Sequence, residues 1–141
     1  MSYHKLLTIS CPGVYAFAAV FYHNKDNSEK SQHYLDKFIS LHKMCTPLNF
    51  LECGGDELLV GRAGYLCGVL YLQEHLGKDV IPAAVIQTLV KSIVASGRKC
   101  AKKLKCTSPL MYTYYDAKYL GAAHGLSSIL QVGLCFLAVA F

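Results

Sequence analysis

The feature that most constrains this chain is an apolar segment that recurs three times, each time behind a glycine. The segments begin at Gly13, Gly64 and Gly125 and read GVYAFAAV, GYLCGVLY and GLSSILQV. They follow one another at similar intervals, which is typical of a repeated helical hairpin with loops of variable length. The apolar spacing is helical almost throughout, and no stretch shows clean two-residue alternation. The pattern predicts an all-α fold.

The same periodicity places the helices. We expect helices over residues 11–24, 28–44, 57–77 and 83–104, and a fifth that starts within 121–132. The first helix of each pair carries almost no charge behind its glycine, whereas the second carries most of the Lys and Glu. Apolar inner helices with amphipathic outer ones describe a partial α/α toroid, or an open solenoid, of about two and a half hairpins.

Length and charge limit the classes of function. A chain of 141 residues with 53% hydrophobic residues predicts one domain with a substantial core. Its net charge of +5 is concentrated in residues 91–105, where four cations (Arg98, Lys99, Lys102 and Lys103) lie close together. Such a run is either a solvated helix face or a contact for an anionic membrane surface or an acidic peptide. Because no aromatic side chain interleaves with the charges, we expect no nucleic acid partner.

Cysteine usage indicates the compartment. The seven cysteines form an odd number without a C-x-x-C pair, and several lie in apolar helical settings. This favours a reducing environment and predicts a cytoplasmic protein, with a peripheral position at the plasma membrane as the alternative.

Three longer motifs resemble one known family. The segments CPGVYAFAAVFYH, DELLVGRAGYLCGVLYLQEHLG and SPLMYTYYDAKYLGAAHGLSSILQ are similar to the lanthionine synthetase C-like proteins, nearest to the third of the animal paralogues. The resemblance implies an α/α toroid whose active site lies at the rim of the inner barrel. It further implies the addition of a thiol, glutathione in the animal proteins, to a dehydroamino acid in a peptide.

The resemblance also implies roles for particular residues. His124 in GAAHG matches a histidine that acts as general acid/base. We expect Gly121, Gly125 and Arg62 to bind the substrate. Zinc activates the thiol in the family, since coordination yields a thiolate at neutral pH. Its ligands are a cysteine and a Cys-His pair, but this chain contains no Cys-His-Gly segment. We therefore expect no metal site here, and His33, His42 and His75 are interpreted as surface residues.

The ends of the chain lead to a further expectation. Residues 1–5 form a leader, 6–131 are family-like, and 132–141 form a divergent apolar tail, all within one partial domain. We interpret the chain as an N-terminal fragment whose open edge favours self-association. The tail is either sequence translated past an exon end or, counted from Leu120, a stretch long enough for a membrane anchor.

Three classes of function follow. The leading one is a lanthionine synthetase C-like protein that lacks zinc ligands and is inactive by itself. The second is a non-catalytic helical interaction module, associated with a membrane through its basic helix and apolar tail. The third, a glycosidase-like toroid, needs paired carboxylates across a ring. Asp56 and Glu57 are adjacent and are better explained as helix caps, and Asp116 stands alone.

Overall fold

The computed structural model describes residues 11–140 and confirms the prediction of an all-α fold. Within that range the only β-type pairing is an isolated bridge between Tyr114 and Ala117. The helices are α2 (Cys11–His23), α3 (Ser28–Ser40), α4 (His42–Cys45), α5 (Arg62–Leu76), α6 (Ala83–Lys103), α7 (Leu126–Leu134) and α8 (Leu137–Ala140).

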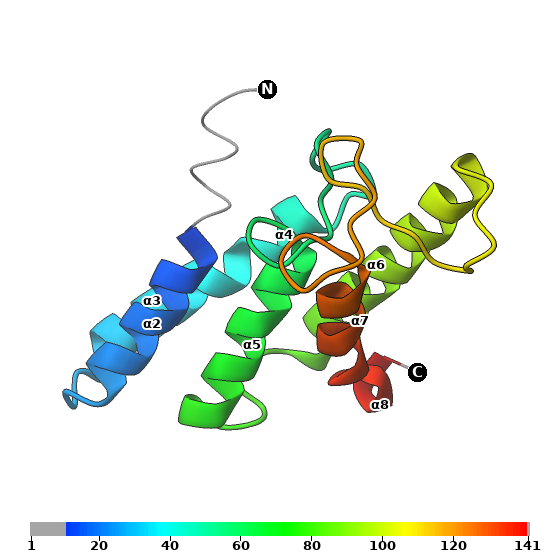
Figure 1. The fold of residues 1–141 in the computed structure, drawn as a ribbon. Coiled ribbons are helices and arrows are strands. Elements are labelled where there is room, and N and C mark those ends of the chain that lie inside the picture. The colour runs from blue at the N-terminus through cyan, green and yellow to red at the C-terminus, as the bar shows by residue number, and fades with distance from the viewer. Residues whose placement is uncertain (1–10, 141) are drawn as a thin grey trace.

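The helices pair as hairpins and stack side by side. Helices α2 and α3 form the first hairpin, and α5 and α6 form the second (Figure 1). Because α2 contacts α5 and α5 contacts α7, these three make an inner row. The arrangement is that of a partial helical toroid, as the alternation of apolar and amphipathic helices predicts.

One apolar core joins the two hairpins. Phe38 of α3 is fully buried, and its ring stacks on Tyr65 of α5 at a centroid distance of 4.5 Å. The Tyr65 hydroxyl donates a hydrogen bond of 3.0 Å to the Phe38 carbonyl, so this polar group is satisfied inside the core. Leu89 of α6 and Ile129 of α7 are both fully buried in the same cluster.

Two helix boundaries differ from the prediction. The expected helix over 57–77 begins only at Arg62, because the Glu57 side chain accepts from the Val60 N–H and Gly61 is extended (φ −103°, ψ −169°). The expected helix over 28–44 is divided, since Leu41 lies between α3 and α4 and donates its N–H to the Phe38 carbonyl. Gly77 caps α5 as expected, with φ 112° and an N–H bond to Gln73.

The register of the repeats also needs correction. Gly13 and Gly64 lie inside α2 and α5, whereas Gly125 precedes α7 as its N-cap residue. The structural counterpart of Gly125 is therefore Gly61, the N-cap of α5. Alignment of the apolar segments by their nearest glycine therefore places the start of the second repeat about one helical turn too late.

The apolar tail folds back onto the molecule. Val132 and Phe136 are buried in the core, and α8 contacts α6. The break between α7 and α8 lies at Cys135 and Phe136. Within residues 11–140, no helix combines the length and the apolar character that a membrane crossing requires.

Candidate functional site

Two loops of the same construction meet at one end of the molecule. The first loop (residues 55–61) precedes α5 and the second loop (residues 119–125) precedes α7 (Figure 1). In the first, the opening N–H groups of α5 bond back to the Gly55 and Asp56 carbonyls at 2.8 and 3.2 Å. In the second loop, the opening N–H groups of α7 donate to the Tyr119 and Leu120 carbonyls at 2.9 and 3.2 Å. Each loop thereby caps its own helix.

A buried ion pair fixes the first loop. The Arg62 guanidinium is inaccessible to solvent and pairs with Asp56, whose second oxygen accepts from Ser96 of α6 at 2.5 Å. Arg62 also donates to the carbonyls of Cys45 at 2.7 Å and Pro47 at 2.6 Å. Burial raises the pKa of the Asp56 carboxyl, and the Arg62 and Ser96 contacts oppose that rise.

The neighbouring carboxylate, Glu57, reaches the second loop. Its Oε1 accepts from the Val60 N–H, and its Oε2 lies 2.6 Å from Nδ1 of His124. The Glu57 side chain is 2% exposed and that of His124 is 30% exposed. The carboxylate is thus buried behind an imidazole whose outer edge faces solvent.

Aromatic rings fix the plane of the imidazole. Tyr114 stacks on His124 with a centroid distance of 4.4 Å and an interplanar angle of 6°. Tyr119 lies at 5.8 Å from the same ring and is tilted by 55°. Burial is the main factor that raises the pKa of Tyr114, and the nearby Glu57 carboxylate adds to the rise. The hydrogen bond and the stacked ring together restrict His124 to one orientation.

The predicted site residues fall into two groups. His124, Gly121 and Gly125 lie together in the second loop, where Gly121, Ala122 and Ala123 are exposed beside the imidazole. A side chain at Gly125 would collide with the Tyr119 and Gly121 carbonyls, so the loop requires glycine there. Arg62 is separate from them and buried, with its donors occupied inside the protein. Substrate binding by these residues stays a prediction.

The side chains of Asp56 and Glu57 do not cap α5, contrary to the expectation, although the backbone carbonyl of Asp56 does accept from the Ala63 N–H. Asp56 pairs with Arg62, and Glu57 bonds to His124, because the loop turns both carboxylates inward ahead of α5. No spacing in the sequence connects Glu57 with His124. The correct register, which aligns Gly61 with Gly125, would have placed both loops at the same end of the inner row.

The arrangement suits proton transfer. Within the described residues, the one side-chain hydrogen bond of His124 is at Nδ1, and Nε2 has no partner there. A histidine held at Nδ1 by a carboxylate is a general acid/base whose tautomer is fixed. No three side chains of His, Cys, Asp or Glu gather as a metal ion would need within residues 11–140.

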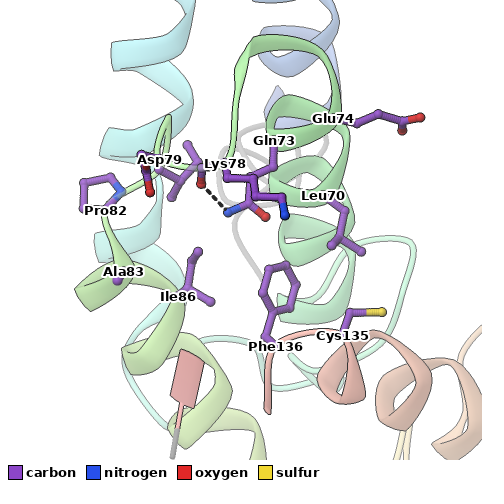
Figure 2. Close-up of a pocket in the computed structure, with 11 residues that line it drawn as sticks. Leu70, Gln73, Glu74, Lys78, Asp79, Pro82, Ala83, Ile86, Cys135 and Phe136 are labelled. Carbon is purple, nitrogen blue, oxygen red and sulfur yellow. Dashed lines mark hydrogen bonds between the residues drawn. The ribbon is translucent and has the colours of Figure 1, made fainter. Parts of the chain in front are cut away.

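A separate cavity of about 650 Å³ lies at the other end of α5. Gln73, Lys78 and Asp79 lie at its rim, and Ile86 and Phe136 line its apolar wall (Figure 2). The Gln73 amide is already bonded to the Lys78 carbonyl at 2.9 Å, and the Glu74 carboxylate points away from the cavity. The charged groups of the cavity, on Lys78 and Asp79, therefore lie at its rim, and its wall is apolar.

The stacked hairpins define a class of proteins: helical repeat arrays in which paired loops precede the inner helices at one end. Comparison with known proteins specifies the family. The model of the lanthionine synthetase C-like proteins matches residues 11–139. The chain is 35% identical over 122 residues to glutathione S-transferase LANCL1 of Danio rerio. The chain thus belongs to the lanthionine synthetase C-like family.

The match covers the two proteins unequally. It includes 83% of this chain but 29% of the Danio rerio relative. This chain therefore spans less than a third of the length of the relative.

Proposed function

We propose that this chain supplies the proton-transfer part of a site that adds a thiol to dehydroamino acids in peptides. The observation that carries the proposal is the contact of 2.6 Å between Glu57 Oε2 and His124 Nδ1 across the two loops. The name of the Danio rerio relative, a glutathione S-transferase, favours glutathione as the thiol.

The reaction assigns one task to each residue. The thiolate sulfur forms a bond to the β-carbon of the dehydroamino acid, and the electron pair of the double bond moves onto the α-carbon and its carbonyl. His124, protonated at Nε2, gives that proton to the α-carbon. Glu57 is a positioning residue that accepts from Nδ1 and stabilises the charged ring while it acts.

The thiolate has to come from elsewhere. In the family zinc activates the thiol, but the residues described here do not form a group that fits the metal. We propose that the chain by itself binds no zinc and does not accelerate the addition. Cytoplasmic location and membership of the third animal paralogue remain predictions of the same kind.

A chimera tests the proposed role. Residues 11–139 replace the matching segment of the Danio rerio relative, and the addition of glutathione to a dehydroalanine peptide is followed by mass spectrometry. We expect an active chimera in which His124→Asn lowers kcat by about 10²- to 10⁴-fold, the usual contribution of a general acid/base. Glu57→Gln is expected to lower kcat by less and to leave KM unchanged.

The chain offers a matched control for this experiment. His75 lies near the end of α5, and its Nδ1 contacts the Tyr71 carbonyl at 2.9 Å, far from the two loops. His75→Asn should leave kcat unchanged. An active chimera that is indifferent to His124→Asn would contradict the proposed role.

A second candidate function is contact with an anionic membrane. Helix α6 contains no acidic residue, and Arg98, Lys99, Lys102 and Lys103 are exposed along its second half. Within residues 11–140 none of the four takes part in an ion pair, and Lys99 only donates to the amide oxygen of Asn49. Each free cation near an anionic surface adds about 1 kcal/mol of attraction.

Vesicle binding tests this candidate. Replacing the four α6 cations by alanine should weaken binding to phosphatidylserine vesicles by at least about 100-fold. Alanine at Lys25, Lys30, Lys37 and Lys43 removes the same charge elsewhere and serves as the control. Equal losses in both variants would mean that net charge, and not this helix, determines binding.

A further inference from the structure

The turn beside His124 holds an unusual backbone conformation. Tyr115 and Asp116 have φ values of 47° and 61°, and both lie between Tyr114 and Ala117. Reciprocal backbone bonds of 3.0 and 3.1 Å between Tyr114 and Ala117 close the turn. Two-residue turns with positive φ at both central positions favour Asn-Gly, and a bulky aromatic residue there is strained.

Contacts on several sides hold the turn in place. The Tyr115 N–H donates to the Cys53 carbonyl at 2.7 Å. Gly54 packs so closely on the Thr113 carbonyl that a side chain at Gly54 would collide with it. Strain of this kind persists when the surroundings determine the conformation, and it is concentrated at functional sites.

The Tyr115 side chain is exposed although its backbone is tightly held. It is 62% exposed, and its ring meets the edge of Tyr114 at 4.8 Å, while Tyr114 stacks on His124. Within the described residues no hydrogen bond involves the Tyr115 hydroxyl. The ring thus lies one aromatic layer away from the imidazole.

Other exposed apolar side chains belong to the two loops that hold Glu57 and His124. Leu120 is 64% exposed in the second loop, and Leu59 is 60% exposed in the first loop. Tyr119, also exposed, lies against His124 itself. Exposed apolar side chains on loops that hold a polar group favour contact with a ligand.

We propose that Tyr115 binds the side chain next to the reacting residue of the peptide, and that it selects peptides with an apolar residue at that position. This inference rests on the proposed function, since it takes a peptide as the occupant of the site. Asparagine or glycine would relieve the strain in the turn, but neither would present an aromatic face at this point.

Binding of labelled peptides to the 141-residue chain tests the inference by fluorescence anisotropy. One peptide has leucine on both sides of a dehydroalanine, a second has glycine there, and a third has leucine around a saturated alanine. We expect the wild type to bind the leucine-flanked dehydroalanine peptide about tenfold more tightly than the glycine-flanked one.

Two variants separate contact from structure. Tyr115→Asn should remove the preference for leucine flanks and raise Tm by about 3 °C, because asparagine tolerates positive φ. Asp116→Gly should also raise Tm but keep the preference, since it retains the Tyr115 ring. If Tyr115 only supported Tyr114, its replacement would weaken both peptides equally.

The outcomes are distinguishable. An unchanged preference in Tyr115→Asn, equal binding of leucine- and glycine-flanked peptides, or no binding of any peptide overturns the inference. Equal binding of the dehydroalanine and alanine peptides, with the preference still dependent on Tyr115, supports the inference while contradicting selection of dehydroamino acids by the site.

Discussion

At the scale of single residues, two adjacent carboxylates have different partners and different roles. Asp56 forms a buried ion pair with Arg62, and this pair fixes the first loop. Glu57, the next residue, contacts His124 instead. Arg62 is fully buried, and its pair with Asp56 holds the loop that presents Glu57.

Cys45 provides a prediction at this scale. It is 5% exposed beside Arg62, and burial raises the pKa of its thiol to about 11, against a smaller opposing effect of the guanidinium. At pH 8 only about 0.1% of such a thiol is thiolate, so iodoacetamide should leave it unmodified in the folded protein. Exposed Cys135 should react readily.

Peptide mapping after alkylation measures both sites. The rate at Cys45 should rise about tenfold per pH unit up to about pH 11, because only the thiolate reacts. Rapid alkylation of Cys45 at pH 8 in folded protein would show that the packing around Arg62 is looser than described.

At the scale of elements, the N-terminal ends of α5 and α7 determine where the loops with Glu57 and His124 lie. Gly61 and Gly125 are N-cap residues of α5 and α7 with almost the same backbone angles. Neither has a positive φ, so glycine is needed for space and not for conformation. A Cβ at Gly61 would collide with the Glu57 backbone, and one at Gly125 with the Tyr119 carbonyl.

Alanine substitutions test this requirement. Gly61→Ala and Gly125→Ala should each lower the free energy of unfolding by about 1–3 kcal/mol, since backbone atoms cannot yield as a flexible side chain can. Gly133→Ala is the control: it lies in α7, nothing lies within 4 Å of the added Cβ, and it should stabilise by about 0.5–1 kcal/mol. Urea unfolding measures all three. Loss of stability confined to Gly133→Ala would contradict the cap geometry.

The elements also show what could be predicted from the sequence. Helical periodicity identified the helices, because burial of an apolar stripe leaves a regular pattern. The start of α5 could not be read in this way, since Leu58, Leu59 and Val60 continue the apolar pattern while Gly61 and the Glu57 side chain end the helix. The contact between Glu57 and His124 depends on two loops far apart in sequence, which no local pattern records.

At the scale of the whole molecule, the inner row ends in exposed apolar stripes. On α2, Val14 and Phe17 are each 63% exposed. On α7, Leu134 is 64% exposed, and Leu130 lies one turn before it. Because α2 and α7 lie on opposite sides of α5, the two stripes border the row at both ends (Figure 1). Stripes of this kind favour association between molecules.

Sedimentation velocity tests this prediction. We expect the chain to self-associate, and a variant with Phe17→Asp and Leu134→Asp to sediment as a monomer. Leu59→Asp is the matched control, because Leu59 is as exposed but lies in the first loop and not on either stripe. A wild-type chain that remains monomeric at high concentration would contradict the prediction.

The central claim is that Glu57 holds Nδ1 of His124 and leaves Nε2 free for chemistry. The imidazole ¹⁵N shifts of His124, recorded at about pH 8.5, where an ordinary imidazole is neutral, report directly which nitrogen carries the proton. We predict a single tautomer protonated at Nδ1 in the wild type, and loss of that preference in Glu57→Met, which removes the acceptor. A wild-type His124 protonated at Nε2, or a tautomer unchanged by Glu57→Met, would contradict the account.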